Sequence, residues 1–374
     1  MMEKIDRSYE TMTSKQRVRC VLNREKPDRV PINYFSNPGI DARLRACLGP
    51  NTDLYEYLGV DFREIGAGYT GPVLHTSNRA DRQVDSMYGW ITRYVAYGNA
   101  GYWDYCDFPL EMAEVEEVER WKMPDPDHFD YASLEGQLAA NEGYAIHIGN
   151  ASLDCIMNIA GFLRGMEQVF VDLITEDEAG LLMIDKFIAV HFGKLERELH
   201  TIEKLARSKG KRVNELVDFV WMGEDLGTQH APLISHELLE KQILPRQKPF
   251  FDLCESYGLP TMLHTCGSSS WAYEDYIKLG LKAVDTLQPE AANMSPEYLK
   301  RTFGGRLVFH GCISTTGKFA YGTKQEAIED CEHILEVMKP GYEYCFSPTH
   351  SLQDNTIVEN VFAAYATAHK AGRY

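Results

Sequence analysis

The sequence of 374 residues has no hydrophobic run of the ~18 residues that a membrane-spanning helix needs. Its first residues, MMEKIDRSYETMTSKQRVR, lack the apolar stretch of a secretory signal. Basic residues are outnumbered, 38 against 55 acidic ones, which gives a formal net charge of −17. Nucleic acids and anionic membranes bind basic surfaces, so we expect neither as a partner. These absences predict a cytoplasmic protein.

Two catalytic signatures are also missing. The chain has no phosphate-binding P-loop and no G-x-S-x-G nucleophile elbow, which disfavours a P-loop nucleotide hydrolase and a simple acyl hydrolase. The nine cysteines are odd in number and scattered, so they do not suggest a disulfide framework. We expect reduced thiols, which leaves thiolates available for metal binding.

Short β-rich runs alternate with longer helical patterns along the chain. Several of the runs are nearly continuously apolar, as is typical of parallel strands buried on both faces. The eight expected strands are residues 29–35, 64–69, 145–150, 218–222, 259–264, 283–287, 307–310 and 342–346. The clearest helical patterns cover about 178–208, 236–257 with an interruption at Pro245, and 324–338.

This alternation predicts an α/β fold, a (β/α)8 TIM barrel, with a doubly wound open sheet as the alternative. We expect a single domain over residues 1–374. A barrel needs ~250 residues, so the chain has room for an insertion at about 70–126. The aromatic, glycine-spaced part of that insertion predicts a β-hairpin over the barrel mouth.

Polar residues follow five of the expected strands. In a barrel, the carboxyl ends of the strands carry the active site, so these segments would converge on one pocket. They are residues 223–225, 264–267, 288–290, 310–312 and 347–350.

His264 and Cys266 are the first candidates for chemistry. Residues two apart at a strand end point to the same side, and imidazole and thiolate are both good zinc ligands. A third ligand would come from Cys312, His350 or Glu224. The alternative is a buried cysteine beside a hydrogen-bonded histidine, which is common in protein cores.

Glu224 and Asp225 are adjacent carboxylates, whose side chains on an extended strand point to opposite faces. We expect Glu224 to face the pocket while Asp225 caps the next helix. With His310 at the seventh strand end, they are the candidate catalytic residues.

Six segments, in order, give the sequence a resemblance to the uroporphyrinogen decarboxylase superfamily, and within it to the corrinoid- or cobalamin-dependent methyltransferase branch. They include MTSKQRVRCVLNREKPDRVPINYF at the start, HTCGSSS around His264, and GYEYCFSPTHSLQDNTIVENVFAAYATA at the end. The remaining three segments cover residues 161–187, 223–248 and 309–335. The family fold is a (β/α)8 barrel, which agrees with the strand count.

The resemblance implies a zinc-dependent methyltransferase that works with a corrinoid (cobalamin) cofactor, held by a corrinoid protein or used as co-substrate. The family holds zinc by His-x-Cys and a distant Cys; His264 and Cys266 match the first two, whereas the third position reads His350. The set of metal ligands is therefore His264 and Cys266 with His350, Cys312 or Glu224. A small methoxy-aromatic or thiol would be the methyl donor or acceptor, as in O-demethylation by an anaerobe, and a homodimer is possible by family analogy.

The alternative function is a metal-free decarboxylase, a lyase that acts on a carboxylated substrate. Uroporphyrinogen decarboxylases carry an R-Q-A-G-R-Y motif whose arginines hold substrate carboxylates, but residues 34–39 here read YFSNPG. A third class is a non-catalytic corrinoid- or tetrapyrrole-binding protein. The aromatic residues of the expected hairpin either line the entrance for a ring substrate or pack the hairpin itself; they are Tyr94, Tyr102, Trp103 and Tyr105.

Overall fold

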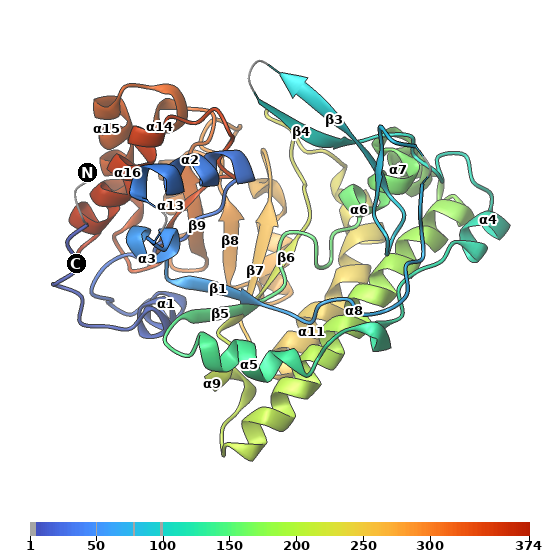
Figure 1. Ribbon diagram of the computed structural model, residues 1–374, viewed down its shortest axis with the longest axis horizontal. Helices are drawn as coiled ribbons and strands as arrows, with labels where there is room; N and C mark the ends of the chain where they lie inside the picture. Colours follow the sequence, from blue (N-terminus) through green and yellow to red (C-terminus); the bar gives the residue numbers. More distant parts are fainter. Residues whose placement is uncertain (1–4, 50, 78, 98–99) are drawn as a thin grey trace.

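The computed structural model describes residues 5–49, 51–77, 79–97 and 100–374. Within them, seven strands form one curled parallel sheet in the order β1-β5-β6-β7-β8-β9-β10, with helices around its outside (Figure 1). The strands are β1 (Phe62–Ile65), β5 (Ala145–Ile148), β6 (Phe219–Gly223), β7 (Thr261–Thr265), β8 (Ala283–Thr286), β9 (Val308–Ile313) and β10 (Tyr344–Pro348). The expected α/β fold with a parallel sheet is confirmed, and seven of the eight expected runs overlap these strands.

The first expected run, residues 29–35, is not a regular strand. Ile32 makes an isolated parallel bridge to Phe346 of β10. Its carbonyl also accepts the N–H of Asp61, next to β1, at 2.8 Å. Pro31 lacks an N–H and cannot donate to a ladder, which explains why only single bridges form. The segment therefore bonds to both edges of the sheet without completing a ladder.

The three long helical patterns are present. Helix α8 (Glu178–Ser208) and helix α15 (Lys324–Met338) have the expected bounds, and α15 starts with a capping box between Thr323 and Glu326. The expected interruption at Pro245 is instead a π-helical stretch, η2 (Leu239–Ile243), that joins α10 (His236–Leu238) to α11 (Leu244–Ser256). The wider turn precedes the proline, which has no N–H to donate.

The other helices are shorter. They are α1 (Ser14–Leu22), α2 (Pro38–Leu48), α3 (Leu54–Leu58), α4 (Val115–Arg120), α5 (Ser133–Ala140), α6 (Met157–Arg164), α7 (Met166–Thr175), α9 (Val213–Leu216), α12 (Tyr273–Lys278), α13 (Pro296–Phe303), α14 (Lys318–Tyr321) and α16 (Val358–Ala371), with 3-10 turns η1 (Pro126–His128) and η3 (Ser270–Ala272). None of the described helices combines the length and the apolar character that crossing a bilayer requires.

The inner face of the sheet has its own apolar layer. Phe62, Phe219 and Val308, from three strands, pack with Val18 and Val21 of α1 in one buried cluster. Helix α1 thus covers one end of the sheet from inside. The larger cluster lies between the sheet and the outer helices. Residues beyond the inner apolar layer, toward the carboxyl ends, are polar and form the site described below.

A second, antiparallel sheet of β2 (Gln83–Val84), β3 (Ile91–Tyr97) and β4 (Ala100–Tyr105) lies within the segment expected as an insertion. The tip of its β3–β4 hairpin falls outside the described residues. The base packs on α6, where the rings of Tyr105 and Phe162 stack with centroids 3.6 Å apart. A position over a barrel mouth, and a single domain with an insertion at 70–126, stay predictions.

Candidate metal centre

Three potential ligands come together at the carboxyl ends of β6 and β7. Atoms of Asp225, His264 and Cys266 that can bind a metal all lie within 4.8 Å of one another. Cys266 Sγ lies 3.5 Å from His264 Nε2. The Asp225 carboxylate is anchored, since it accepts the N–H of Cys266 at 2.8 Å and the side-chain amide of Asn158 at 2.7 Å. Imidazole, thiolate and carboxylate are the donors that zinc takes in proteins.

Asp285 of β8 fixes the orientation of His264. Its Oδ2 lies 2.6 Å from His264 Nδ1, and its Oδ1 lies 2.5 Å from Nδ1 of His310. Burial would raise the pKa of Asp285, but the two imidazoles outweigh it and hold that pKa well below its usual range. Burial likewise opposes the charged form of His264, yet Asp285 and Cys266 raise the pKa of His264 well above its ordinary value.

His310 of β9 is fully buried and lies beside Asp285 in the strand register, as Asp285 lies beside His264. Its Nε2 lies 3.1 Å from the side-chain nitrogen of Asn33. The rings of Phe62 and Trp221 stand edge-on to it, with centroids 5.4 and 5.3 Å away. His310 is thus joined to the centre through Asp285 and is separated from solvent.

Glu224 and Asp225 point to opposite faces, as expected. Their roles are exchanged, however, since Glu224 was expected in the pocket and Asp225 at the helix cap. Glu224 is buried and accepts the backbone N–H groups of Ile156 at 2.6 Å and Met157 at 3.2 Å, at the start of α6. Burial raises the pKa of Glu224 well above its ordinary value. The structure therefore gives the helix-capping position to Glu224 and brings Asp225 to His264 and Cys266.

His350 and Cys312 are not among the three clustered residues. His350 follows β10, and its residue surface is largely exposed. Desolvation of the imidazole by neighbouring atoms, together with the positive charge of His264, lowers the pKa of His350. Cys312 has a positive φ of 68° directly after Gly311 at 129°, a local break in the extended backbone. Its side chain is buried in the outer hydrophobic cluster, where burial raises the pKa of the thiol.

The hairpin aromatics have two different environments. Tyr94, Tyr102 and Trp103 are 55%, 45% and 43% exposed, and Tyr94 meets Trp103 edge to face. The ring of Tyr105 instead stacks on the ring of Phe162. Packing of the hairpin base therefore accounts for Tyr105 but not for the exposed rings.

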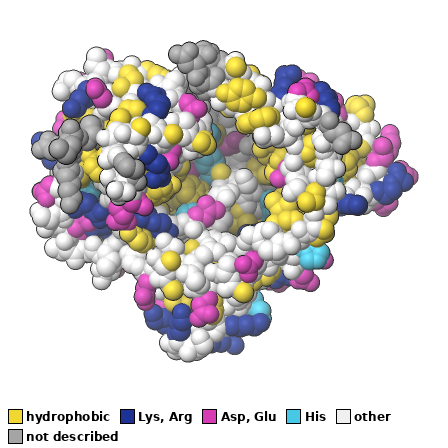
Figure 2. All heavy atoms as spheres, viewed as in Figure 1, with side chains coloured by type: hydrophobic (Ala, Val, Ile, Leu, Met, Phe, Trp, Pro, Cys, Tyr) yellow, Lys and Arg dark blue, Asp and Glu magenta, His cyan; other side chains and the backbone are white. Residues whose placement is uncertain are grey.

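The molecule is hollowed near the centre of the face in Figure 2, with histidine side chains visible inside. A cavity of ≈ 360 Å³ adjoins the ends of β1 and β5, where Glu64, Phe129 and His191 line it. The loop 66–71 beside it has G-x-G-x-x-G spacing, but the next described element is strand β2 instead of the helix that a dinucleotide site requires.

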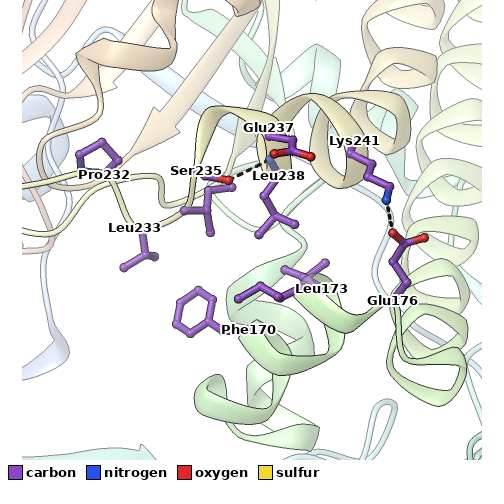
Figure 3. Close-up of a pocket in the computed structure, with 11 residues that line it drawn as sticks. Phe170, Leu173, Glu176, Pro232, Leu233, Ser235, Glu237, Leu238 and Lys241 are labelled. Atoms are coloured by element: carbon purple, nitrogen blue, oxygen red, sulfur yellow. Dashed lines mark hydrogen bonds and ion pairs between the residues drawn. The ribbon is translucent and has the colours of Figure 1, made fainter.

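A larger cavity of ≈ 580 Å³ lies between α7 and the segment that leads into α10 (Figure 3). Phe170, Leu173 and Leu238 give it an apolar floor, and an ion pair between Glu176 and Lys241 lies at its edge. None of the predicted site residues lines this cavity, so it is separate from the candidate metal centre.

Three residues of the centre were not predicted from the sequence: Asn33, Asn158 and Asp285. Asp285 was hidden inside an expected strand, AVDTL, yet a charged residue in a run buried on both faces is itself a signal. Asp285 lies three positions before the segment 288–290, which was the only part considered as the end of this strand. Asn158 carried no such signal.

Comparison with known proteins supports the sequence-based resemblance. Residues 213–371 match the family model "Uroporphyrinogen decarboxylase (URO-D)". A solved structure of a methyltransferase from Methanosarcina mazei is similar, with a TM-score of 0.60, 16% identity, and 96% of this chain and 99% of that chain covered. At that identity the structural likeness shows the fold alone. No curated protein matches. The resemblance to the superfamily is confirmed over residues 213–371.

Proposed function

We propose that this chain, a relative of the uroporphyrinogen decarboxylases, is a zinc-dependent methyltransferase that moves a methyl group between a small substrate and a corrinoid. The observation that carries the proposal is the convergence of Asp225, His264 and Cys266 at the carboxyl ends of two neighbouring strands. The substrate is a methoxy-aromatic compound or a thiol, and the corrinoid is free or carried by a partner protein. The match to the family and the fold shared with a methyltransferase support this choice.

The donor set suits zinc. Asp225, His264 and Cys266 would supply three protein ligands and leave a fourth position for substrate, which is the pattern of catalytic zinc. Zinc bound there would act as a Lewis acid toward the ether oxygen or thiol sulfur of the substrate. In this proposal Asp225 is the third ligand, in place of the expected His350, Cys312 or Glu224.

Hydrogen bonds from neighbouring residues fix the proposed ligands in position. Asp225 cannot swing away easily, because Cys266 N–H and Asn158 hold its two oxygens. Asp285 holds Nδ1 of His264, so Nε2 is the nitrogen directed at the ligand cluster. Glu224, with its raised pKa, secures the start of α6 beside β6 instead of contacting substrate.

We also infer that the sheet closes as an eight-stranded barrel with residues 30–36 in the eighth position. The support is the pair of contacts that Ile32 makes, a bridge to Phe346 of β10 and a backbone bond to Asp61 beside β1. Closure would surround the metal centre with the ends of all eight strands, as in other barrel enzymes.

The test is methyl transfer by zinc-loaded protein under anaerobic conditions. Cob(I)alamin is offered with a panel of methoxy-aromatic compounds, and methylcobalamin with a panel of thiols, and the change in cobalamin absorption is followed. We expect transfer by wild type and by Cys47→Ala, which removes an exposed thiol, but not by Cys266→Ala. Absence of transfer in both directions by zinc-loaded wild type would refute the proposal. Release of CO2 from a carboxylated substrate by metal-free protein would support the lyase instead.

A further inference from the structure

A continuous line of buried side chains runs from the backbone of residues 33–34 to His264. Tyr34 N–H donates to Asn33 Oδ1 at 2.9 Å. Asn33 Nδ2 lies 3.1 Å from His310 Nε2, and His310 Nδ1 lies 2.5 Å from Asp285 Oδ1. Asp285 Oδ2 lies 2.6 Å from His264 Nδ1. The line thus joins the segment between β10 and β1 to the candidate metal centre on the far side of β8.

The direction of every hydrogen bond in this line follows from its first member. A backbone N–H can only donate, so Asn33 must direct its oxygen at Tyr34 and its NH2 group at His310. His310 Nε2 then accepts, and its proton lies on Nδ1, where it is donated to Asp285. The other carboxylate oxygen accepts from His264 Nδ1, which directs the His264 Nε2 atom at Cys266.

The line is held rigidly and apart from water. Asn33 is 4% exposed, and His310 and Asp285 are fully buried. The rings of Phe62 and Trp221 enclose the His310 imidazole and keep it from turning over. A carboxylate with a single imidazole would have been enough to orient His264, so the second imidazole and the amide have a separate consequence: they fix the carboxylate itself.

We propose that Asn33 and His310 are positioning residues of the metal centre, which hold Asp285 so that His264 presents Nε2 to the ion. This inference rests on the proposed function, because the role given to the two residues assumes a metal ion at Asp225, His264 and Cys266. The hydrogen-bond directions do not depend on the metal. Hydrogen bonds to the far nitrogen of a metal-binding histidine commonly change metal affinity by about 10- to 100-fold.

The affinity test is a Co²⁺ titration of the metal-free protein, followed by the absorption of the thiolate–cobalt complex and repeated with Zn²⁺ by competition. His310→Phe keeps a ring but removes the donor, and we expect the Kd for both ions to rise about 10-fold or more. His310→Asn returns an N–H near the former Nδ1 position and should restore the Kd to within about threefold of wild type. A purely structural role would not produce this difference between two folded variants.

His147→Phe is the matched control, because His147 is another buried inner-face histidine and its Nδ1 bonds to the carbonyl oxygen of Gly149, at 3.0 Å, instead of to Asp285. Its Kd should equal that of wild type. An unchanged Kd in His310→Phe, or an equal loss in His147→Phe, would overturn the proposal.

A second readout separates this inference from the proposed function. In metal-free protein with ¹⁵N-labelled histidine, NMR should show His310 protonated at Nδ1 and bare at Nε2. Asn33→Ala should shift the ¹⁵N resonance of Nε2, which loses its donor, while the proton stays on Nδ1 in the hydrogen bond to Asp285. A proton on Nε2 of His310 in wild type would overturn the inference even if the metal binds. Failure of wild type to bind Co²⁺ or Zn²⁺, with the expected tautomer present, would refute the metal site while the hydrogen-bond line stands.

Discussion

Removal of the Asp61 carboxylate should cost the protein several kcal/mol of unfolding free energy. Asp61 is fully buried and receives Arg17 Nη1 and Arg29 Nη1, each at 2.6 Å. It also accepts the N–H of Ile32 and the hydroxyl of Ser14, both at 2.7 Å. Asp61→Ala would leave two buried guanidinium groups short of a counter-charge and would free Ile32 from its place beside β1.

The size of this loss depends on the ion pairs that the two arginines keep in the variant. Breaking a buried ion pair from one side costs about 3–5 kcal/mol. Arg17 keeps Asp28 at 2.6 Å and Arg29 keeps Glu10 at 2.9 Å, so we expect the lower end of that range, about 3 kcal/mol. Urea unfolding followed by circular dichroism measures it.

Asp252→Ala is the matched control, because Asp252 pairs with Lys248 on the surface with both side chains more than half exposed. It should change stability by no more than about 0.5 kcal/mol. A loss below about 1 kcal/mol in Asp61→Ala, or a loss as large in Asp252→Ala, would refute the reasoning.

The Asp61 carboxylate should also make the folding stability of the protein fall in acid. Burial alone would raise the pKa of Asp61, but Arg29 and Arg17 outweigh burial and lower it. A carboxyl group whose pKa is lower in the folded state contributes stability above the unfolded pKa of ~4, and this contribution is lost as the pH falls below that value. Asp61→Ala should therefore lose less stability on acidification than wild type does.

Five further substitutions have defined outcomes. Cys266→Ala should remove most bound zinc, measured by elemental analysis, while circular dichroism stays native; unchanged zinc would exclude Cys266 as a ligand. His350→Ala and Cys312→Ala should both leave Co²⁺ binding at the wild-type level, because neither side chain is among the three clustered ligands; a marked loss of affinity in either variant would contradict this. Glu224→Leu should lower the unfolding free energy in urea by about 1–3 kcal/mol, because two N–H groups at the start of α6 lose their acceptor, and a neutral result would contradict its capping role. Burial lowers the pKa of His191 to about 4, so the unfolded chain takes up the proton first and stability falls between about pH 6.5 and 4; His191→Gln should remove up to about 3 kcal/mol of that fall, and an unchanged pH profile would refute the assignment.

The parallel sheet and the helix α8 could be predicted from the sequence, because apolar runs and helical periodicity are local signals. The 29–35 segment was expected as a strand, yet Pro31 leaves only single bridges to its neighbours. The hydropathy pattern alone could not show that Pro31 interrupts the ladder. Whether a ladder forms depends on which backbone groups of the neighbouring strands lie opposite this segment.

The site was predicted in part. Strand-end spacing brought His264 and Cys266 together, because period-two alternation is fixed by backbone geometry. Alternation also separates Glu224 from Asp225, but the face that each takes depends on where α6 begins, which is a tertiary contact. The left-handed conformation at Cys312 turns that side chain to the core and is not encoded in spacing.

The central claim is a metal ion at Asp225, His264 and Cys266. Metal analysis of wild-type protein, purified anaerobically without a metal-binding tag and supplied with zinc, tests it directly, with Asp225→Ala purified in parallel. We predict about one zinc per chain in wild type, the stoichiometry of a single catalytic site, and a loss of most of it in the variant. Zinc-free wild-type protein, or full retention of zinc by Asp225→Ala, would contradict the claim.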